Sequence, residues 1–242
     1  MRTLASLLTL MLATVLASPS AHAEAAVPRP FSATYAVTYR GIGAGTITFD
    51  FARDAATDRY IYETHASPST LARLFVSKAA MERSVMEIDA SGTRPIEWRL
   101  DDGKSGNEDD GELHFDWSRD RVTGVVEGKP VELTPEPGTQ DRSSISIAVT
   151  TALLRGVEPG TIPLIDDNRI KRYVYTKKEA ATVDSALGKI ETVIYESTRE
   201  GGSSRTSRFW MAPSLEFLPV RAEQVRKGKV ETVMVLQKLE HH

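Results

Sequence analysis

The sequence offers few side chains for covalent chemistry. It contains no cysteine, and of its five histidines only His65 and His114 lie away from the two ends of the chain. A serine nucleophile would need one of these imidazoles as its base. Ser143 and Ser144 follow Asp141, but no G-x-S-x-G motif surrounds them. Because short oxygen-bearing side chains are the preferred caps of helices, we interpret this group as the start of a helix.

Glu112, His114 and Asp116 are the strongest candidates for acid–base or metal chemistry. Residues two apart in a strand share one face, so these three would project together. Two carboxylates and an imidazole can bind a divalent cation or transfer protons. The solvated face of a half-buried strand would look the same, and the spacing indicates no fourth ligand. We therefore predict no metal and no cofactor, and keep a hydrolase or metal-assisted enzyme centred on His114 and Asp116 as an alternative.

Two charged segments suggest ion or lipid contacts. The acidic segment "DDGKSGNEDDGE", residues 101–112, departs from an EF-hand loop, because placing Gly111 at the sharp turn puts Gly106 where an aspartate is needed. We interpret it as the polar end of a hairpin. The segment "NRIKRYVYTKK", residues 168–178, carries five basic residues. It would suit anionic lipid headgroups or glycans, and it would equally suit an exposed strand edge protected by lysines.

The stretch "YRGIGAGTITFDF", residues 39–51, has the glycine content of a phosphate-binding loop. A dinucleotide site needs a helix directly after its glycines, whereas "TITFDF" alternates like a strand. A kinase glycine loop does lie between two strands, but the other kinase motifs are missing from this sequence. We predict that the glycines form a turn or a bulge between two antiparallel strands.

The elements that must position these residues are mainly strands. Apolar and polar residues alternate over many short segments rich in β-branched and aromatic side chains. We predict a mainly β protein with a large antiparallel curved sheet that forms an open barrel or sandwich, one main helix and a short helical segment. The main helix is expected within 140–156, with Asp141 or Ser143 as its cap and Gly156 at its end. Its apolar stripe is Ile145, Val149 and Leu153.

Both ends of the chain differ from the rest in composition. A basic start, an apolar run and a small-x-small site ending at Ala23 predict a signal peptide over residues 1–23. We interpret residues 239–242 as the remnant of an expression tag, which leaves a single β-rich domain over 24–238. No later segment is long and apolar enough to span a membrane as a helix. We expect a soluble periplasmic protein, and its interspersed charges, with a net charge of −3, do not favour nucleic acid.

The order of several motifs resembles that of one protein family. The motifs are "FSATYAVTYRGIGAGTITFDF", "SGTRPIEWRLDDG", "HFDWSRDRV", "GTQDRSSISIAVTTALLRG" and "RFWMAPSLEFLPVRAEQVRKGKVETVMVLQ". By these motifs the chain is similar to the bacterial domain-of-unknown-function family 3108, over nearly all of the sequence after the signal peptide. The resemblance implies a secreted, β-rich envelope protein, and it supplies no catalytic residues.

Large apolar side chains are the remaining functional signal. In a strongly curved sheet some of them would line a cavity for an apolar ligand, although in an ordinary sandwich they would all be core. The leading hypothesis is a non-enzymatic periplasmic protein that binds a lipid or an acyl chain. The alternative is a structural or adaptor protein that pairs a sheet edge with another envelope protein.

A short helical segment is expected over residues 67–75, with Ser67 as its N-cap and Pro68 as its first helical residue. A helix this short gains little stability alone, so its apolar face must dock, either as core or as a flap at the mouth of a cavity. The candidate ligand contacts are Leu71, Leu74, Phe75, Tyr35, Tyr62 and Trp98.

Overall fold

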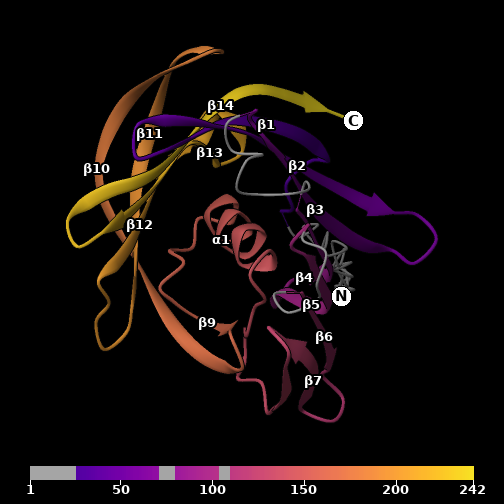
Figure 1. Ribbon diagram of the computed structural model, residues 1–242. Helices are drawn as coiled ribbons and strands as arrows, with labels where there is room; N and C mark the ends of the chain where they lie inside the picture. The colour runs from indigo at the N-terminus through magenta and orange to yellow at the C-terminus, as the bar shows by residue number, and fades with distance from the viewer. Residues whose placement is uncertain (1–25, 71–79, 104–109) are drawn as a thin grey trace, which may run out of the picture.

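The computed structural model describes residues 26–70, 80–103 and 110–242. Its strands form one 14-stranded sheet in the order β8-β7-β6-β5-β4-β3-β2-β1-β14-β13-β12-β11-β10-β9. Figure 1 shows this sheet wrapping round α1 (Ser144–Leu154). The strands are β1 (Phe31–Tyr39), β2 (Ile42–Asp54), β3 (Arg59–Pro68), β4 (Met81–Asp89), β5 (Gly92–Asp101), β6 (Gly111–Asp116), β7 (Arg121–Val126), β8 (Lys129–Leu133), β9 (Thr161–Asp166), β10 (Arg169–Ser185), β11 (Gly188–Arg199), β12 (Arg205–Ala212), β13 (Leu218–Arg226) and β14 (Lys229–His241).

All neighbouring strands pair antiparallel, which is the arrangement expected of strands joined mostly by short hairpin turns. The first strand, β1, pairs with the last, β14, so the two ends of the sheet-forming chain meet in the middle of the sheet. The chain passes from one edge strand, β8, to the other, β9, through α1. The predicted architecture, a mainly β protein with a curved and unclosed antiparallel sheet and one main helix, is confirmed.

Side chains, rather than strand pairing, connect the two edges of the sheet. Ile165 of β9 lies in the same apolar cluster as Val131 of β8. Beside β9, the amide of Gln140 donates to the carbonyl oxygen of Pro163 at 2.8 Å, and the amide of Ile165 donates to the carbonyl oxygen of Gln140 at 2.9 Å. The edge strand β9 is therefore partly covered by the segment that leads into α1.

The glycine-rich stretch forms the hairpin between β1 and β2, as predicted. Arg40 and Gly41 connect the two strands with φ angles of 49° and 82°. Positive φ at both central positions is typical of the tight turns that match the twist of paired strands. At Gly45, a Cβ atom would lie 2.2 Å from the carbonyl oxygen of Ser67, so a glycine is required for β2 and β3 to approach. No helix follows these glycines.

A buried carboxylate organises the start of α1. One oxygen of Asp141 accepts hydrogen bonds from the backbone amides of Ser143 and Ser144, at 2.8 and 2.7 Å. Its other oxygen accepts the hydroxyl of Ser84 from β4, at 2.7 Å. Ser143 holds the N-cap position, but the side chain that satisfies the free amides is that of Asp141. The helix ends before Gly156, whose φ is 70°.

The helix α1 is buried on more than one face, because it lies inside the curve of the sheet (Figure 1). Its predicted stripe packs in one apolar cluster with residues of β9, β11 and β12. That cluster contains Ile145, Val149, Leu153, Ile162, Leu164, Tyr195 and Met211. Ile147 joins a second cluster, built mainly on β1, β2, β3 and β13. Within the described residues, the helices lack the length and apolar character that a membrane span requires.

The predicted start of a second helix at Ser67 is wrong. Ser67 and Pro68 are the last two residues of β3 and pair with β2. Proline is tolerated here because the end of a strand does not require every amide to donate. The remainder of the predicted segment, with the candidate contacts Leu71, Leu74 and Phe75, lies outside the described residues.

The strand β14 continues through the residues interpreted as a tag. Phe31 pairs with His241, and Ala33 pairs with Leu239. Leu239 packs against the cluster that contains Phe31. The predicted signal peptide, residues 1–23, lies outside the described residues.

Candidate functional site

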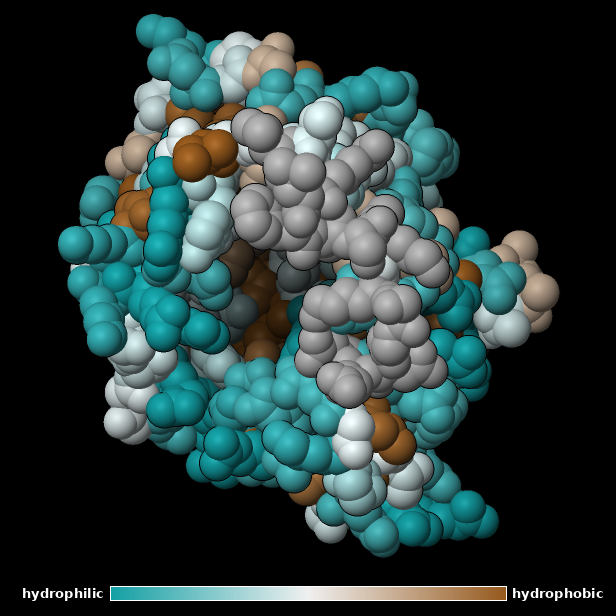
Figure 2. Space-filling view, viewed as in Figure 1, coloured by the Kyte–Doolittle hydropathy of each residue, from teal (hydrophilic) through white to brown (hydrophobic). Residues whose placement is uncertain are grey.

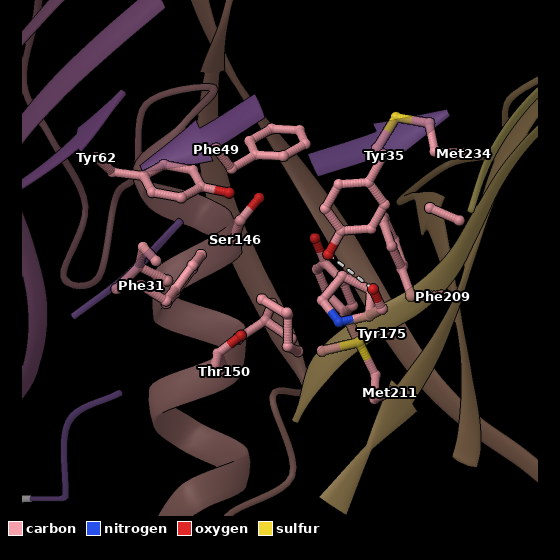
Figure 3. A pocket seen from close by; sticks show the side chains of 15 residues that line it. Phe31, Tyr35, Phe49, Tyr62, Ser146, Thr150, Tyr175, Phe209, Met211 and Met234 are labelled. Atoms are coloured by element: carbon pink, nitrogen blue, oxygen red, sulfur yellow. Dashed lines mark hydrogen bonds between the residues drawn. The ribbon is translucent and has the colours of Figure 1, made fainter. Parts of the chain in front are cut away.

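An apolar cavity of about 70 Å³ lies between α1 and the concave face of the sheet. Figure 3 shows aromatic side chains from the strands facing the helix across it. Its lining comes from three strands of the N-terminal half (β1, β2 and β3), four strands of the C-terminal half (β10, β12, β13 and β14) and one side of the helix. The residues are Phe31, Tyr35, Phe49, Tyr62, Ser146, Ile147, Val149, Thr150, Tyr175, Phe209, Met211, Leu218, Pro219, Ala222 and Met234.

Four aromatic rings of β1, β2 and β3 form one wall of the cavity. The ring of Phe49 meets Tyr35 edge-on with ring centres 5.4 Å apart, and it stacks on Tyr62 at 5.8 Å. Phe31 meets the other side of Tyr62 at 6.4 Å. Alternation along each strand aims these side chains to the concave face. Contacts between neighbouring rings hold the wall in one arrangement.

Hydroxyl groups are the polar atoms of this lining. The hydroxyl of Tyr35 donates to the carbonyl oxygen of Pro219 at 2.8 Å. The hydroxyls of Tyr62 and Ser146 point toward each other (Figure 3). Burial raises the pKa of Tyr35 and of Tyr62 well above the ordinary value, and it raises the pKa of Tyr175 to about 12. All three phenols are therefore neutral at physiological pH, and the cavity carries no charge.

The cavity opens to solvent beside α1. Ser146 is exposed although its neighbours Ile145 and Ile147 are buried in the same helix. Figure 2 shows a hollow with a hydrophobic floor and a largely hydrophilic visible rim, in the region that α1 and the concave face occupy in Figure 1. An apolar lining, a few hydroxyls and an opening are the features of a small-molecule binding site. Among the lining residues there is no acid, base or nucleophile with an activating partner.

The structure brings two of the predicted contact residues to the cavity. Tyr35 and Tyr62 line it. Trp98 does not, because it lies in a separate apolar cluster built on β5 to β9, where it is 1% exposed. Its indole nitrogen donates to a carboxylate oxygen of Glu82 at 2.6 Å. The ring is therefore packed in that core, and its polar atom has a hydrogen-bond partner.

Several lining residues were not predicted as contacts. Ser146 and Thr150 lie on α1, and Tyr175, Phe209 and Met234 come from strands far along the chain. The helical spacing of the two hydroxyl residues, four apart, was the available signal for a small polar stripe on α1. The strand residues carry no such signal, because alternation shows a buried face without showing what it faces.

The Glu112, His114 and Asp116 face of β6 points to solvent. Glu112 and His114 are exposed, while Leu113 and Phe115 on the other face are buried. Asp116 accepts the hydroxyl of Ser118 at 2.6 Å and the backbone amide of Ser118 at 3.1 Å. The hydroxyl hydrogen bond is the main cause that lowers the pKa of Asp116. This carboxylate therefore stabilises the β6–β7 turn.

The acidic connection between β5 and β6 brings three carboxylates together. Oxygens of Asp101, Asp102 and Asp110 lie within 4.8 Å of one another. The backbone amide of Asp102 donates to Asp110 at 3.0 Å, and the amide of Gly103 donates to Asp101 at 2.8 Å. These bonds fit the predicted polar end of a hairpin, and residues 104–109 of the connection lie outside the described residues.

Acidic partners neutralise most of the basic segment 168–178. Lys171 contacts Asp166 at 2.6 Å and Asp167 at 2.8 Å. Arg172 contacts Glu136 at 2.8 Å. Lys177 and Lys178 each lie within 4 Å of a glutamate. The first part of the segment, up to Val174, lies between β9 and β11, whereas Lys177 and Lys178 lie beyond β9, where β10 pairs with β11 alone.

The two edge strands are short, and each contains a proline. β8 has Pro130, and β9 has Pro163, where the amide needed by an incoming strand is missing. Gln140 also bridges to Leu164 along β9. Short, proline-containing and covered edges are typical of sheets that avoid pairing with other chains. The adaptor function through a sheet edge stays a prediction. The strands β8 and β9 do not favour it, but β10 after Val174 pairs with β11 alone and leaves a longer edge.

Comparisons with known proteins give one solved structure whose fold agrees with the observed one. No curated protein matches the chain. A β-barrel-like protein of domain of unknown function DUF1849 from Brucella abortus superposes with a TM-score of 0.56 at 14% identity, covering 90% of this chain and 100% of that chain. A protein described as exported, with a YmcC-like fold, from Bacteroides fragilis gives a TM-score of 0.34 at 10% identity, covering 90% of this chain and 99% of that one.

The model of one protein family, described as a protein of unknown function (DUF3108), matches residues 34–235. This range extends from β1 to β14 and contains α1. It includes most of the motifs on which the resemblance was based. The chain therefore belongs to the DUF3108 family.

Proposed function

We propose that the protein is a non-enzymatic, exported envelope protein that binds an apolar ligand, an acyl chain, in the cavity between α1 and the sheet. The observation that carries this proposal is the uncharged, aromatic-walled cavity that opens to solvent beside Ser146. The N-terminal signal pattern supports export to the periplasm. The hydrophobic effect supplies the affinity, with about 0.8 kcal/mol for each methylene group removed from water.

The size of the cavity limits what it takes. An engineered apolar cavity of about 150 Å³ binds benzene, and the cavity here has about half that volume. The carboxyl end of an acyl chain, with its first methylene groups, fits such a space, and the remainder of the chain would follow the opening beside α1. Met211 and Met234 lie in the lining, and their unbranched side chains adapt readily to the shape of a ligand.

The hydroxyls give the site a means of orienting a ligand with one polar end. Tyr62 and Ser146 face each other near the opening (Figure 3). Each can donate a hydrogen bond to a carboxyl or ester oxygen. A neutral phenol is required for that role, and the raised pKa of Tyr62 keeps it protonated. Fatty acids and acyl esters therefore suit the site better than plain hydrocarbons.

Binding of a fluorescent fatty acid tests the proposal. We expect the wild-type protein to bind the probe saturably. Ser146→Leu should weaken binding tenfold or more, because the larger side chain fills the opening without removing any core contact. As a matched control, Thr46→Leu adds the same side chain at an exposed position of β2 away from the lining, and should leave binding unchanged. Absence of probe binding by the wild type, together with no co-purified lipid in native mass spectra, would refute the proposal.

A further inference from the structure

Three hairpin turns at one end of the sheet bring basic side chains together. Arg226 of β13 pairs with Lys229 across its own turn and with Arg205 of β12. The amide of Arg40, in the β1–β2 turn, donates to the carbonyl oxygen of Glu231 on β14 at 2.6 Å. We call this group the basic rim, and it consists of Arg40, Arg205, Arg226, Lys227 and Lys229. Its members are all exposed.

The basic rim surrounds a surface hollow of about 690 Å³. Its lining is Arg40, Arg226, Lys227, Lys229, Val230 and Glu231. Arg40 forms an ion pair with Glu231 at 2.6 Å. That hydrogen bond is the main cause that lowers the pKa of Glu231, and the charges of Arg226 and Arg205 lower it further. Glu231 is thus held ionised within a largely positive surface.

Apart from Arg40, which pairs with Glu231, the residues of the basic rim have no acidic partner close by in the described part of the chain. In the described part of the chain, no carboxylate lies within 4.0 Å of the cationic groups of Arg205, Arg226, Lys227 or Lys229. The chain as a whole has a net charge of −3, so this surface is opposite in sign to the molecule that carries it. The basic segment 168–178 differs, because acids pair with most of its charges.

Exposed apolar side chains lie among the basic residues. Ile42 is 64% exposed, Tyr39 is 48% exposed and Val230 is 43% exposed. Tyr39 and Ile42 face each other across the β1–β2 turn, and Val230 follows Lys229 in β14. The guanidinium of Arg40 lies 5.1 Å from the centre of the Tyr39 ring. Apolar side chains that gather on a surface rimmed by charged residues are typical of a protein or membrane interaction site.

We propose that the basic rim docks on the surface of a membrane that contains anionic phospholipid. Lysine and arginine are attracted to the negative headgroups, and the apolar side chains of Ile42, Tyr39 and Val230 enter the interface between headgroups and acyl chains. A nucleic acid would use the charges but would leave the aliphatic side chains in water. The surface hollow has room for a phosphate headgroup between Arg226, Lys229 and Arg40.

The membrane surface and the cavity are separate sites on the same strands. Ala222 lines the cavity four residues before Arg226 on β13, and Tyr35 lines it four residues before Tyr39 on β1. At about 3.3 Å per residue the separation is about 13 Å. Docking through the basic rim would hold the cavity near the headgroups, but docking does not depend on the cavity binding any ligand.

Vesicle sedimentation tests this inference. The full chain should sediment with vesicles of phosphatidylcholine and phosphatidylglycerol, and not with phosphatidylcholine alone, and salt should release it. The variant Arg226→Gln/Lys227→Gln/Lys229→Gln should bind on the order of a hundredfold more weakly, since each basic side chain near an anionic surface contributes a factor of about five. The control Arg169→Gln/Lys177→Gln/Lys178→Gln removes the same charge elsewhere and should bind like the wild type.

A second pair of variants tests the apolar contacts. Ile42→Ser should weaken vesicle binding about fivefold, because partial burial of an isoleucine side chain is lost. Leu187→Ser, in the β10–β11 turn at the other end of β11 from Arg199, should have no effect, since Leu187 is also exposed, at 44%, but lies away from the basic rim. Equal thermal melts would show that all variants are folded. The inference is overturned if the wild type does not sediment with the anionic vesicles, if both triple variants lose binding equally, or if the protein binds inorganic phosphate but no vesicle.

Discussion

Two regions of the sheet, one toward its β8 edge and one at its centre, place aromatic side chains inside the same curve with different results. Around β5–β8, Trp98 and Phe115 pack against Ile165 and fill the interior. Around β1–β3 and β12–β14, Tyr35 and Phe49 face α1 and leave a cavity. The difference lies in what stands opposite the rings, which is an aliphatic cluster in the first region and a helix face with small hydroxyl side chains in the second.

The helix face decides where the cavity lies. Ser146 and Thr150, four residues apart, place small polar side chains on the side of α1 toward the aromatic wall. On another side, Ile145 and Leu153 fill the space against β9, β11 and β12, and Val149 lies between the two sides. A larger residue at Ser146 would make the two regions alike, so Ser146→Leu should reduce ligand binding without disturbing the core.

The largest expected effect is a loss of stability that leaves ligand affinity unchanged. Trp98→Ala removes a fully buried ring and leaves a void, so it should lower the free energy of unfolding by about 3–5 kcal/mol. The protein that remains folded should bind a fatty-acid probe with unchanged affinity, since Trp98 does not line the cavity. Urea unfolding and probe titration measure the two quantities. Phe49→Leu, at the aromatic wall, is the counterpart. It should weaken binding of the probe and lower the free energy of unfolding by less than Trp98→Ala does.

The carboxylate that ties α1 to β4 gives a pH-dependent test of the same framework. Burial raises the pKa of Asp141 to about 6, although the hydrogen bonds from Ser144, Ser84 and Ser143 act to lower it. In the unfolded chain the pKa of an aspartate is about 4, so the folded protein binds the extra proton between these values. The stability associated with that proton is therefore complete below about pH 4 and is lost as the pH rises through about 6.

A shift of about two pK units corresponds to roughly 3 kcal/mol. The difference in unfolding free energy between the wild type and Asp141→Asn should therefore change by up to this amount from pH 4 to pH 7, in the direction that favours Asp141→Asn at the higher pH. The asparagine keeps an oxygen for the amides of Ser143 and Ser144 and does not titrate. A difference that is flat over this range would contradict a raised pKa for Asp141.

The smallest expected effect concerns the hydroxyls of the cavity. Tyr62→Phe keeps the ring packing against Phe49 and Phe31, so stability should change by less than about 1 kcal/mol. Affinity for a fatty acid should fall about fivefold, because one hydrogen bond to the carboxyl group is lost. Affinity for an alkane of equal length should not fall. An equal loss of affinity for the fatty acid and the alkane would mean that Tyr62 acts through packing alone.

Local patterns in the sequence predicted much of the fold. Alternation showed the strands, and the short polar side chains around Asp141 showed where the main helix begins. The pairing of β1 with β14 could not be predicted, because it joins residues about two hundred positions apart and no local signal specifies it. Ser67 and Pro68 have the residue types of a helix start, yet their pairing with β2 prevails and they end a strand.

The site was less accessible to prediction than the fold. Tyr35 and Tyr62 could be named because large aromatic residues at alternating positions are candidates for any interior surface. Trp98 satisfies the same criterion and lies in a filled core. Which aromatic residues line a cavity depends on the position of α1 inside the sheet. The basic rim likewise combines turns that are remote in the sequence, whereas the contiguous basic segment 168–178 is neutralised by acids from neighbouring loops and strands.

Photo-crosslinking with a diazirine-labelled fatty acid tests the location of ligand binding most directly. The protein would be irradiated with the probe, digested and mapped by mass spectrometry. We expect saturable adducts on peptides from α1 and from the cavity-lining parts of β1, β2 and β14, and we expect excess unlabelled fatty acid to suppress them. Adducts confined to the filled region around Trp98 or to the outer face of the sheet, or labelling that does not saturate, would contradict binding in the cavity.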